Sequence, residues 1–259
     1  MIDLLCCPTC KRAPLKPTGG GLECDQCRSM VAVHGRRYDF EPETISTEWQ
    51  AQQDAALPEY HEEEYNADTS IPRLFGNFMA VSLDRNGTVL DIGSGISPQL
   101  PHYVAELGLQ NYIGVEPFRV EVNPEYTMLA GAIAERLPLQ DETIGAVIFA
   151  TSMDHIEGLE QAMAEVRRVL KPNGAVYAWI GVYDPGTIAT AKTFDVIWRG
   201  GPLRKAARLI GAPVEQLHTL WKMRDRRKRL ATGPRLTRII AAGGRVIKCH
   251  RSSRNLDLR

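Results

Sequence analysis

The chain has 259 residues, with 31 Lys and Arg against 31 Asp and Glu, so its formal net charge is zero. Hydrophobic residues make up 44% and charged residues 24%, which is the balance of a globular protein and excludes a disordered or fibrous chain. No apolar run approaches the ~18 residues of a membrane span. Three cysteines lie where a secretory signal would carry its apolar region, so a cytoplasmic location is expected.

Two C-x2-C pairs lie in the first forty residues, Cys7 with Cys10 and Cys24 with Cys27, and thirteen residues separate them. Each pair can present two thiolates, and four thiolates close a tetrahedral zinc site with no open position. Such a short segment buries too little surface to fold alone, so a structural zinc ion is expected to stabilise a ribbon over residues 1–40. The alternative is two reduced or disulfide-linked pairs. Cys6 does not give the two-residue spacing.

Charge is distributed unevenly along the chain. Residues 41–70 hold nine acids and no Lys or Arg, whereas residues 186–259 hold eighteen Lys and Arg against four acids. Two interpretations stay open: the basic part binds an anionic partner, or the two segments pack against each other and cancel.

Residues 89–98 (VLDIGSGISP) organise the rest of the chain. An apolar β-type run contains Asp91 near its end, a Gly-Ser-Gly turn follows, and a helix pattern begins with Ser97 as N-cap and Pro98 as first helical residue. A strand, a glycine turn and a helix N-terminus commonly cradle a nucleotide-like ligand. Pro98 stands where the dinucleotide fingerprint needs its third glycine, and the acid before the turn suits a cationic or amine-bearing ligand better than a phosphate.

Strand and helix patterns then alternate. Residues 111–115 form a second strand pattern that ends at Glu116, and an acid there can accept hydrogen bonds from both ribose hydroxyls. Further strands are expected at 126–130, 144–150 and 175–180, and a helix with apolar residues from 159 to 170 precedes the stop signal Lys171-Pro172-Asn173-Gly174. This alternation predicts an α/β fold with a doubly wound, mostly parallel sheet.

The glycine motif, with Ser97 in place of a last glycine, and Ala134-Glu135-Arg136-Leu137-Pro138-Leu139 resemble the D-x-G-x-G-x-G and A-E-x-L-P-F elements of the class I S-adenosylmethionine (SAM) methyltransferases, type 11-like. The resemblance implies a Rossmann-like methyltransferase domain over residues 88–259. It also implies a linker over 41–87 that covers the cofactor and shapes the acceptor pocket. The implied SAM contacts are Asp91, Gly93, Ser94, Gly95, Glu116, Pro117, Ala134, Glu135 and Thr151.

The N-terminal ribbon resembles the small zinc-ribbon domain that activates several methyltransferases and is sometimes fused to their N-termini. In a related ribbon, at the head of bacterial rRNA guanine-N1 methyltransferases, the last metal ligand can be a histidine. That resemblance makes His34 a further candidate ligand beside the four cysteines.

His155 ends the loop Thr151-Ser152-Met153-Asp154-His155, which follows the fourth strand at the ligand-binding edge of the sheet. It either takes a proton from the acceptor or only shapes the pocket. The loop lacks the Asn/Asp-Pro-Pro-Tyr motif of exocyclic-amine methylation, and no Cys is placed for cytosine-C5 chemistry. The expected reaction is methyl transfer to oxygen or nitrogen of a small-molecule or glycan-type anionic acceptor. RNA methylation, and a SAM-binding scaffold acting through a partner, are the alternatives.

Overall fold

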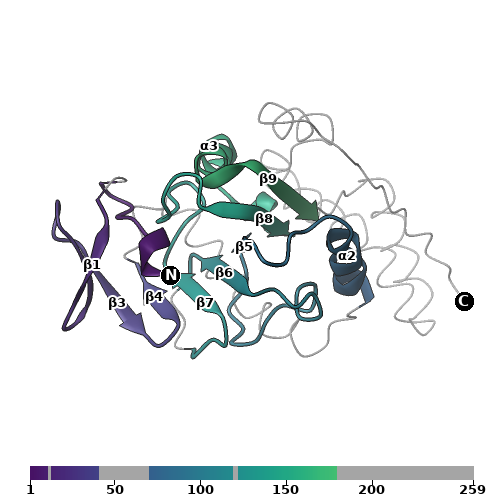
Figure 1. Ribbon diagram of the computed structural model, residues 1–259, viewed down its shortest axis with the longest axis horizontal. Coiled ribbons are helices and arrows are strands. Elements are labelled where there is room, and N and C mark those ends of the chain that lie inside the picture. The colour runs from purple at the N-terminus through teal and green to yellow at the C-terminus, as the bar shows by residue number, and fades with distance from the viewer. Residues whose placement is uncertain (11–12, 41–69, 119–121, 180–259) are drawn as a thin grey trace, which may run out of the picture. The chain divides into compact units, whose positions relative to one another are not determined.

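A parallel sheet of five strands forms the centre of the computed structural model, which describes residues 1–10, 13–40, 70–118 and 122–179 (Figure 1). The strands are β5 (Thr88–Ile92), β6 (Asn111–Glu116), β7 (Thr127–Ala130), β8 (Ile144–Ala150) and β9 (Leu170–Trp179). Their spatial order is β7-β6-β5-β8-β9, with every pair parallel. The chain therefore winds to one side of β5 and then to the other, which confirms the expected doubly wound fold.

The helix expected from Ser97 onward is absent, because residues 97–110 form only turns and bends. Ser97 Oγ accepts a hydrogen bond from the Gln99 N–H (3.2 Å), as an N-cap would. Pro101, however, has no N–H to continue a helix. The backbone oxygen of Ser97 accepts the Tyr126 hydroxyl (3.0 Å), and that of Pro98 accepts the Glu125 N–H (2.9 Å), so tertiary partners occupy the carbonyls that a helix would use.

The fifth strand begins earlier than the sequence predicts. Helix α3 (Leu159–Val169) ends one residue before β9, and Leu170 already pairs with Ile144 of β8. An irregularity in the pairing follows, after which Ala175 pairs with Ala146. Pro172 is tolerated within β9 because this strand lies at the edge of the described sheet, where a missing N–H removes no ladder bond.

Both faces of the sheet are buried. Helix α2 (Ser70–Ala80) packs Phe75 and Met79 into an apolar cluster with Val89 and Ile148, whose side chains share one face of the sheet. Strand residues of the opposite parity, such as Leu90, are buried as well. Near-continuous apolar runs are the sequence signature of a parallel sheet covered on both faces.

The N-terminal ribbon contains the 3-10 helix η1 (Ile2–Leu4) and four antiparallel strands, β1 (Leu15–Thr18), β2 (Gly21–Cys24), β3 (Met30–His34) and β4 (Arg37–Asp39). Strand β4 also pairs in parallel with β7, which extends the described sheet to nine strands. The Phe40 N–H donates to the Ala130 oxygen at 2.8 Å and continues this pairing. The ribbon is therefore hydrogen-bonded to the edge of the core sheet.

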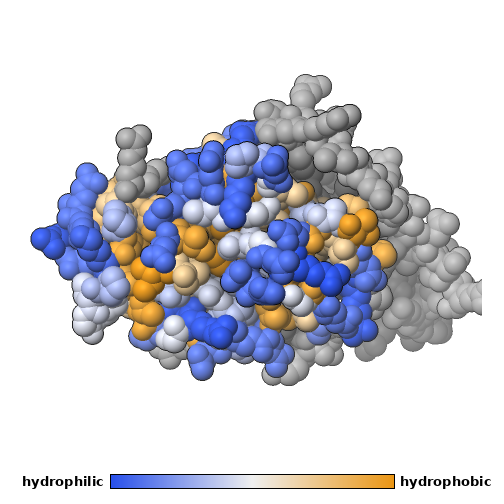
Figure 2. All heavy atoms as spheres, in the orientation of Figure 1, coloured by the Kyte–Doolittle hydropathy of each residue, from blue (hydrophilic) through white to orange (hydrophobic). Residues whose placement is uncertain are grey.

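The domain boundaries 1–40, 41–87 and 88–259 stay a prediction. Residues 41–69 and 180–259 lie outside the described residues, and these include the acidic segment and the basic C-terminal part. No described helix is long and apolar enough to cross a membrane. Figure 2 shows hydrophobic patches within a mostly hydrophilic face. The large apolar side chains exposed among the described residues are Met1, Met30, Leu74 and Val81.

Candidate cofactor and metal sites

The glycine turn lies at the carboxyl end of β5, where the sheet changes its direction of winding. The N–H groups of Gly93 and Ser94 both donate to the Val115 oxygen of the neighbouring strand β6, at 2.8 and 3.2 Å. Ligands of open α/β sheets bind at this position. The turn is therefore fixed against β6, next to the acid that ends that strand.

Positive φ angles explain both glycines of the turn. Gly93 has φ 75° and Gly95 has φ 84°, a region that side-chain-bearing residues rarely adopt. A Cβ on Gly93 would lie 2.5 Å from the Ser152 Cβ, so the turn packs directly against the loop after β8. A Cβ on Gly95 would meet nothing within 4 Å. The open space beside Gly95 is where a ligand can approach the backbone closely.

Asp91 is fully buried beneath the turn. Its Oδ2 accepts hydrogen bonds from the Tyr103 hydroxyl (2.6 Å) and the Tyr112 hydroxyl (2.5 Å). Burial raises the pKa of Asp91 to about 6, and the two tyrosine hydrogen bonds oppose that rise because they favour the ionised form.

Glu116 ends β6 and faces the same turn. Its Oε2 accepts the Gly95 N–H (3.0 Å) and its Oε1 the Phe118 N–H (3.2 Å) across Pro117. Burial raises the pKa of Glu116 to about 7, against the lowering effect of these two backbone donors. Since a carboxylate offers about four lone-pair sites, each oxygen keeps room for a second donor such as a ribose hydroxyl.

Two buried atoms in this cluster test whether it fits SAM. Among the described residues, Asp91 Oδ1 and Ser94 Oγ are the buried side-chain polar atoms without a hydrogen-bond partner. Buried polar atoms are normally paired, so a bound ligand can satisfy both, with Asp91 Oδ1 as an acceptor and Ser94 Oγ as a donor or an acceptor. Two carboxylates, an unpaired hydroxyl and an open glycine backbone fit a ligand with an ammonium group, a sulfonium and a ribose.

Ala134 and Glu135 lie in the loop after β7. Ala134 is buried, and Glu135 Oε1 accepts the Gly158 N–H (2.8 Å) at the start of α3. The side chain of Glu135 thus connects this loop to the segment that follows β8. The contacts to adenine expected of these two residues stay a prediction.

The loop after β8 is strained at Thr151, which has φ 61° and donates its N–H to the Trp179 oxygen (2.8 Å). Next to it, the Ser152 hydroxyl donates to the Ile92 oxygen (2.5 Å). His155 ends the 3-10 helix η2 (Met153–His155), is half-buried, and donates its backbone N–H to the Ser152 oxygen. Both roles predicted for its side chain, base and pocket residue, stay predictions.

Sequence reasoning missed Tyr103, Tyr112 and Ser152. Tyr112 opens the second strand and Tyr103 sits in a segment taken for a helix, so both were treated as apolar positions. The Tyr112 hydroxyl reaches Asp91 because β6 pairs with β5, and the Tyr103 hydroxyl reaches it from the turn segment after the glycine motif. Ser152 had one signal, its position directly after the fourth strand.

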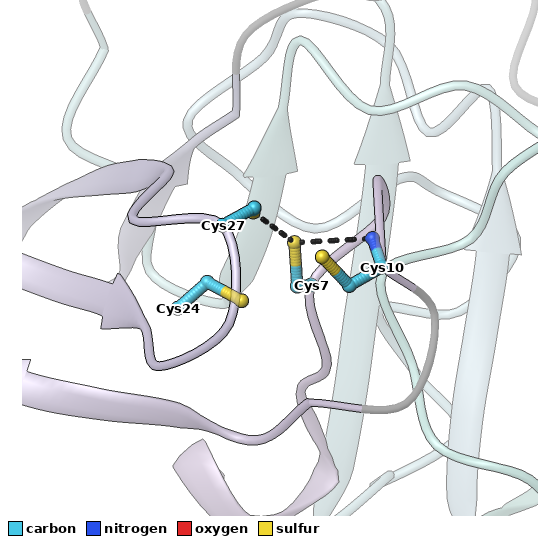
Figure 3. Close-up of side chains that lie close together, drawn as sticks. All are labelled: Cys7, Cys10, Cys24 and Cys27. Carbon is cyan, nitrogen blue, oxygen red and sulfur yellow. Dashed lines mark hydrogen bonds between the residues drawn. The ribbon is translucent and has the colours of Figure 1, made fainter.

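The four predicted metal ligands do come together (Figure 3). The sulfur atoms of Cys7, Cys10, Cys24 and Cys27 all lie within 4.8 Å of one another. In a tetrahedral zinc–thiolate site the sulfurs are about 3.8 Å apart, so this cluster needs only a small contraction. Cys7 Sγ accepts the Cys10 N–H (3.4 Å), and Cys27 Sγ lies 3.0 Å from the Ser29 hydroxyl oxygen. His34 is not in the cluster.

Comparison with known proteins gives a consistent result. The family model described as a methyltransferase domain matches residues 90–178. An uncharacterised methyltransferase of Schizosaccharomyces pombe is 28% identical over 138 residues, 49% of this chain and 54% of that protein, so the chain spans about half the length of the curated relative it matches.

Two solved structures share part of the architecture. One is the complex of the Haloferax volcanii Trm112 methyltransferase activator with a methyltransferase (16% identity, TM-score 0.40, 59% of this chain and 68% of that one). The other is Burkholderia thailandensis 1,6-didemethyltoxoflavin-N1-methyltransferase with bound 1,6-didemethyltoxoflavin and S-adenosylhomocysteine (14%, 0.40, 58% and 68%).

Proposed function

We propose that the chain, which carries a class I SAM-dependent methyltransferase domain with an N-terminal cysteine ribbon, transfers a methyl group to oxygen or nitrogen of an anionic small-molecule or glycan-type acceptor. The observation that carries the cofactor assignment is the pair of buried carboxylates, Asp91 and Glu116, on either side of a glycine turn. SAM, when bound, supplies an activated methyl group on a sulfonium. The protein's part is then to bind, to align and to exclude water.

Each residue has a separate task in this proposal. Asp91 balances the positive charge of the cofactor with its unpaired oxygen, and Glu116 accepts the ribose hydroxyls. Gly95 allows close approach of the backbone, and Ala134 and Glu135 border the adenine. Thr151 and His155 lie on the loop that faces the acceptor. Zinc in the four-cysteine cluster holds the ribbon together and takes no part in the reaction.

Glu116→Gln is expected to weaken SAM binding by about 10- to 100-fold, because charge-assisted hydrogen bonds to the ribose are lost. Isothermal titration calorimetry measures the affinity, and thermal unfolding of the ligand-free protein reports damage to the turn that Glu116 also holds. Glu106→Gln is the matched control, because Glu106 is exposed and pairs only with Arg73 on the surface. Equal affinities of wild type and Glu116→Gln would contradict the ribose assignment.

RNA is the second candidate acceptor, since the ribbon resembles one found in rRNA methyltransferases and residues 224–229 form a dense basic run. Replacing Arg226, Arg227 and Arg229 with Gln separates the candidates. We expect at most weak RNA binding with little sequence preference, because a small acceptor carries only one or two anionic groups and does not require the protein to neutralise several phosphates at once. Filter binding against salt measures this.

The control for that experiment replaces three exposed arginines elsewhere, Arg73, Arg85 and Arg167. Tight, steeply salt-dependent RNA binding that is lost only in the first triple variant would favour the RNA acceptor. A protein that binds SAM but methylates neither cellular small molecules nor RNA would favour the scaffold interpretation. Transfer from radiolabelled SAM to a cell extract, measured with and without depletion of its RNA, measures that outcome.

A further inference from the structure

Asp91 receives its hydrogen bonds on one side only. Both tyrosine hydroxyls donate to Oδ2, at 2.6 and 2.5 Å, while Oδ1 is buried without a partner. An ionised carboxylate can accept about two donors on each oxygen, so half of its capacity is unused. Hydroxyl donors this close to a carboxylate form strong, charge-assisted bonds. The arrangement therefore fixes one oxygen and leaves the other available.

The position of the Tyr112 hydroxyl follows from the sheet register. Tyr112 pairs with Val89, and the residue opposite Asp91 is Gly114. A Cβ on Gly114 would lie 2.4 Å from Ser94 Oγ and 2.8 Å from the Tyr126 ring, so its missing side chain makes room for both. The Tyr112 ring meets the Tyr126 ring edge-on at 5.2 Å. Tyr112 is thereby locked along β6 with its hydroxyl at Asp91.

Tyr103 reaches Asp91 from a different element, the turn segment that follows the glycine motif. Its ring packs against Phe75 of α2, with ring centroids 5.9 Å apart. The backbone oxygen of Tyr103 lies where only a glycine, Gly76, fits in α2. Apolar packing thus fixes this second hydroxyl as well, and its hydrogen bond connects the segment after the turn to Asp91, near the carboxyl end of β5.

We propose that Tyr103 and Tyr112 are positioning residues of the cofactor site, which hold Asp91 by Oδ2 and keep Oδ1 as the acceptor for the cationic part of SAM. This inference rests on the proposed function. With both hydroxyls in place, rotation of the carboxylate would break two strong hydrogen bonds. The same two donors favour the charged carboxylate, which a buried site otherwise disfavours.

The groups that surround Asp91 define what its titration reports. Among the described residues they are Tyr103, Tyr112 and Tyr126, together with Glu116 at the end of β6. Helix α2 adds apolar side chains on this side, and its Arg73 pairs with Glu106 at the surface. No described Lys or Arg therefore stabilises the Asp91 charge, and loss of one tyrosine hydroxyl should move its titration to higher pH.

Tyr103→Phe and Tyr112→Phe test the proposal, with Tyr177→Phe as the matched control. Tyr177 lies in the same apolar cluster, but its hydroxyl contacts Ser82 (3.0 Å) and not Asp91. Carboxyl-carbon NMR of the ligand-free protein follows Asp91, assigned with Asp91→Asn. Each of the two variants should raise its titration midpoint by about one pH unit, equivalent to a tenfold change in proton affinity.

Calorimetry with S-adenosylhomocysteine gives the second readout. With midpoints near pH 6 in wild type and near pH 7 in the variants, affinity should fall about eightfold at pH 5.5 and about twofold at pH 7, and it should match wild type by pH 8.5, where Asp91 is ionised in all three proteins. The control should match wild type in both measurements. A variant that only loosens the packing would lower thermal stability without moving the Asp91 midpoint, and that outcome overturns the proposal. Unchanged affinity despite a shifted midpoint overturns it too.

Failure of the proposed function would give a different experimental result from failure of this inference. A wild-type protein that binds neither SAM nor S-adenosylhomocysteine would refute the cofactor assignment, whereas the NMR titration still reports whether the tyrosines hold Asp91. If Tyr112→Phe does not fold, Tyr103→Phe decides the question alone, because Tyr103 is the less buried of the two.

Discussion

Asp91→Asn is expected to bind SAM about 30- to 100-fold more weakly than wild type, because the site loses a buried charge and a charge-assisted hydrogen bond. Asn keeps the size of the side chain and can still accept both tyrosine hydroxyls. The fold should therefore survive. Calorimetric titration with SAM at pH 8 measures the loss.

The same variant should change how stability depends on pH. Burial raises the pKa of Asp91 from 3.8 to about 6 in the folded protein. The folded state thus binds the proton more tightly, so the stability that Asp91 contributes is present below pH 4 and is lost as pH rises through 6. A shift of about two units corresponds to roughly 3 kcal/mol. Relative to wild type, Asp91→Asn should gain about that much between pH 4 and pH 8.

Urea unfolding at pH 4, 6 and 8 checks this trend. Asp84→Asn is the control, because Asp84 is exposed and its carboxylate only caps the Asn86 N–H (3.0 Å). Burial and, to a smaller extent, the Asp91 charge raise the pKa of Glu116, so a smaller part of the difference between Asp91→Asn and wild type comes from Glu116. If the stability difference between Asp91→Asn and wild type stays constant across pH, then burial does not raise the pKa of Asp91. If Asp91→Asn binds SAM about as tightly as wild type, then Asp91 has no role in cofactor binding.

The sheet could be predicted from the sequence because parallel strands that are buried on both faces have near-continuous apolar sequences. β8 is one uninterrupted apolar run, and its bounds were predicted to the residue. The glycine motif likewise fixed its own conformation, since both glycines have positive φ. The helix predicted after the motif was wrong. The apolar residues at 100–107 have helical spacing, but Pro101 and the contacts of Glu125 and Tyr126 prevent a helix.

Long-range partners explain the other omissions. The four cysteines could be grouped from spacing alone, because metal ligation imposes a fixed short-range pattern. By contrast, nothing in the sequence of β4 shows that it pairs with β7, ninety residues later in the chain. The contact of Tyr112 with Asp91 depends on strand register in the same way, and that of Tyr103 depends on how the segment after the glycine turn folds back. Local rules predicted the parts of the site, and tertiary contacts decided how the parts are joined.

Removal of the zinc proposed for the four-cysteine cluster is expected to unfold the ribbon and also to weaken SAM binding about tenfold. Structural zinc contributes on the order of 10 kcal/mol to modules of this kind, so residues 1–40 should not stay folded without it. From the sequence alone, loss of the metal would be expected to unfold the ribbon and to have little effect on the core. The structure joins it to the core: β4 pairs with β7, the Cys6 N–H donates to the Pro138 oxygen (3.1 Å), and the Gln140 N–H to the Leu4 oxygen (2.8 Å).

These contacts reach the cofactor side through the loop after β7. One small cavity lies between the ribbon and this loop. The ribbon lines it with Pro8 and Phe40, and the loop lines it with Ile133 and Pro138. Ile133 precedes Ala134 and Glu135 in the chain, and Pro138 follows them. The other side of this loop is held by Arg168, which donates to the oxygens of Leu137 (3.0 Å) and Leu139 (2.6 Å). Loss of the ribbon removes the contacts on one side of this loop, so the adenine contacts proposed for Ala134 and Glu135 should weaken while Asp91 and Glu116 stay in place.

Wild-type protein stripped of zinc with a chelator, and the variant Cys24→Ser, should both show early proteolysis within residues 1–40, a lower melting temperature and weaker SAM binding. Added zinc should reverse these three changes in the stripped wild type but not in Cys24→Ser. Cys6→Ala is the control, because Cys6 is buried beside Cys7 but lies outside the metal cluster. Metal analysis of untreated protein should give about one zinc per chain. If removal of zinc unfolds the ribbon and SAM affinity stays unchanged, the prediction is wrong. Pairing of β4 would then stabilise only the edge of the core sheet, and Arg168 and Glu165 would be enough to hold residues 131–140 in their conformation.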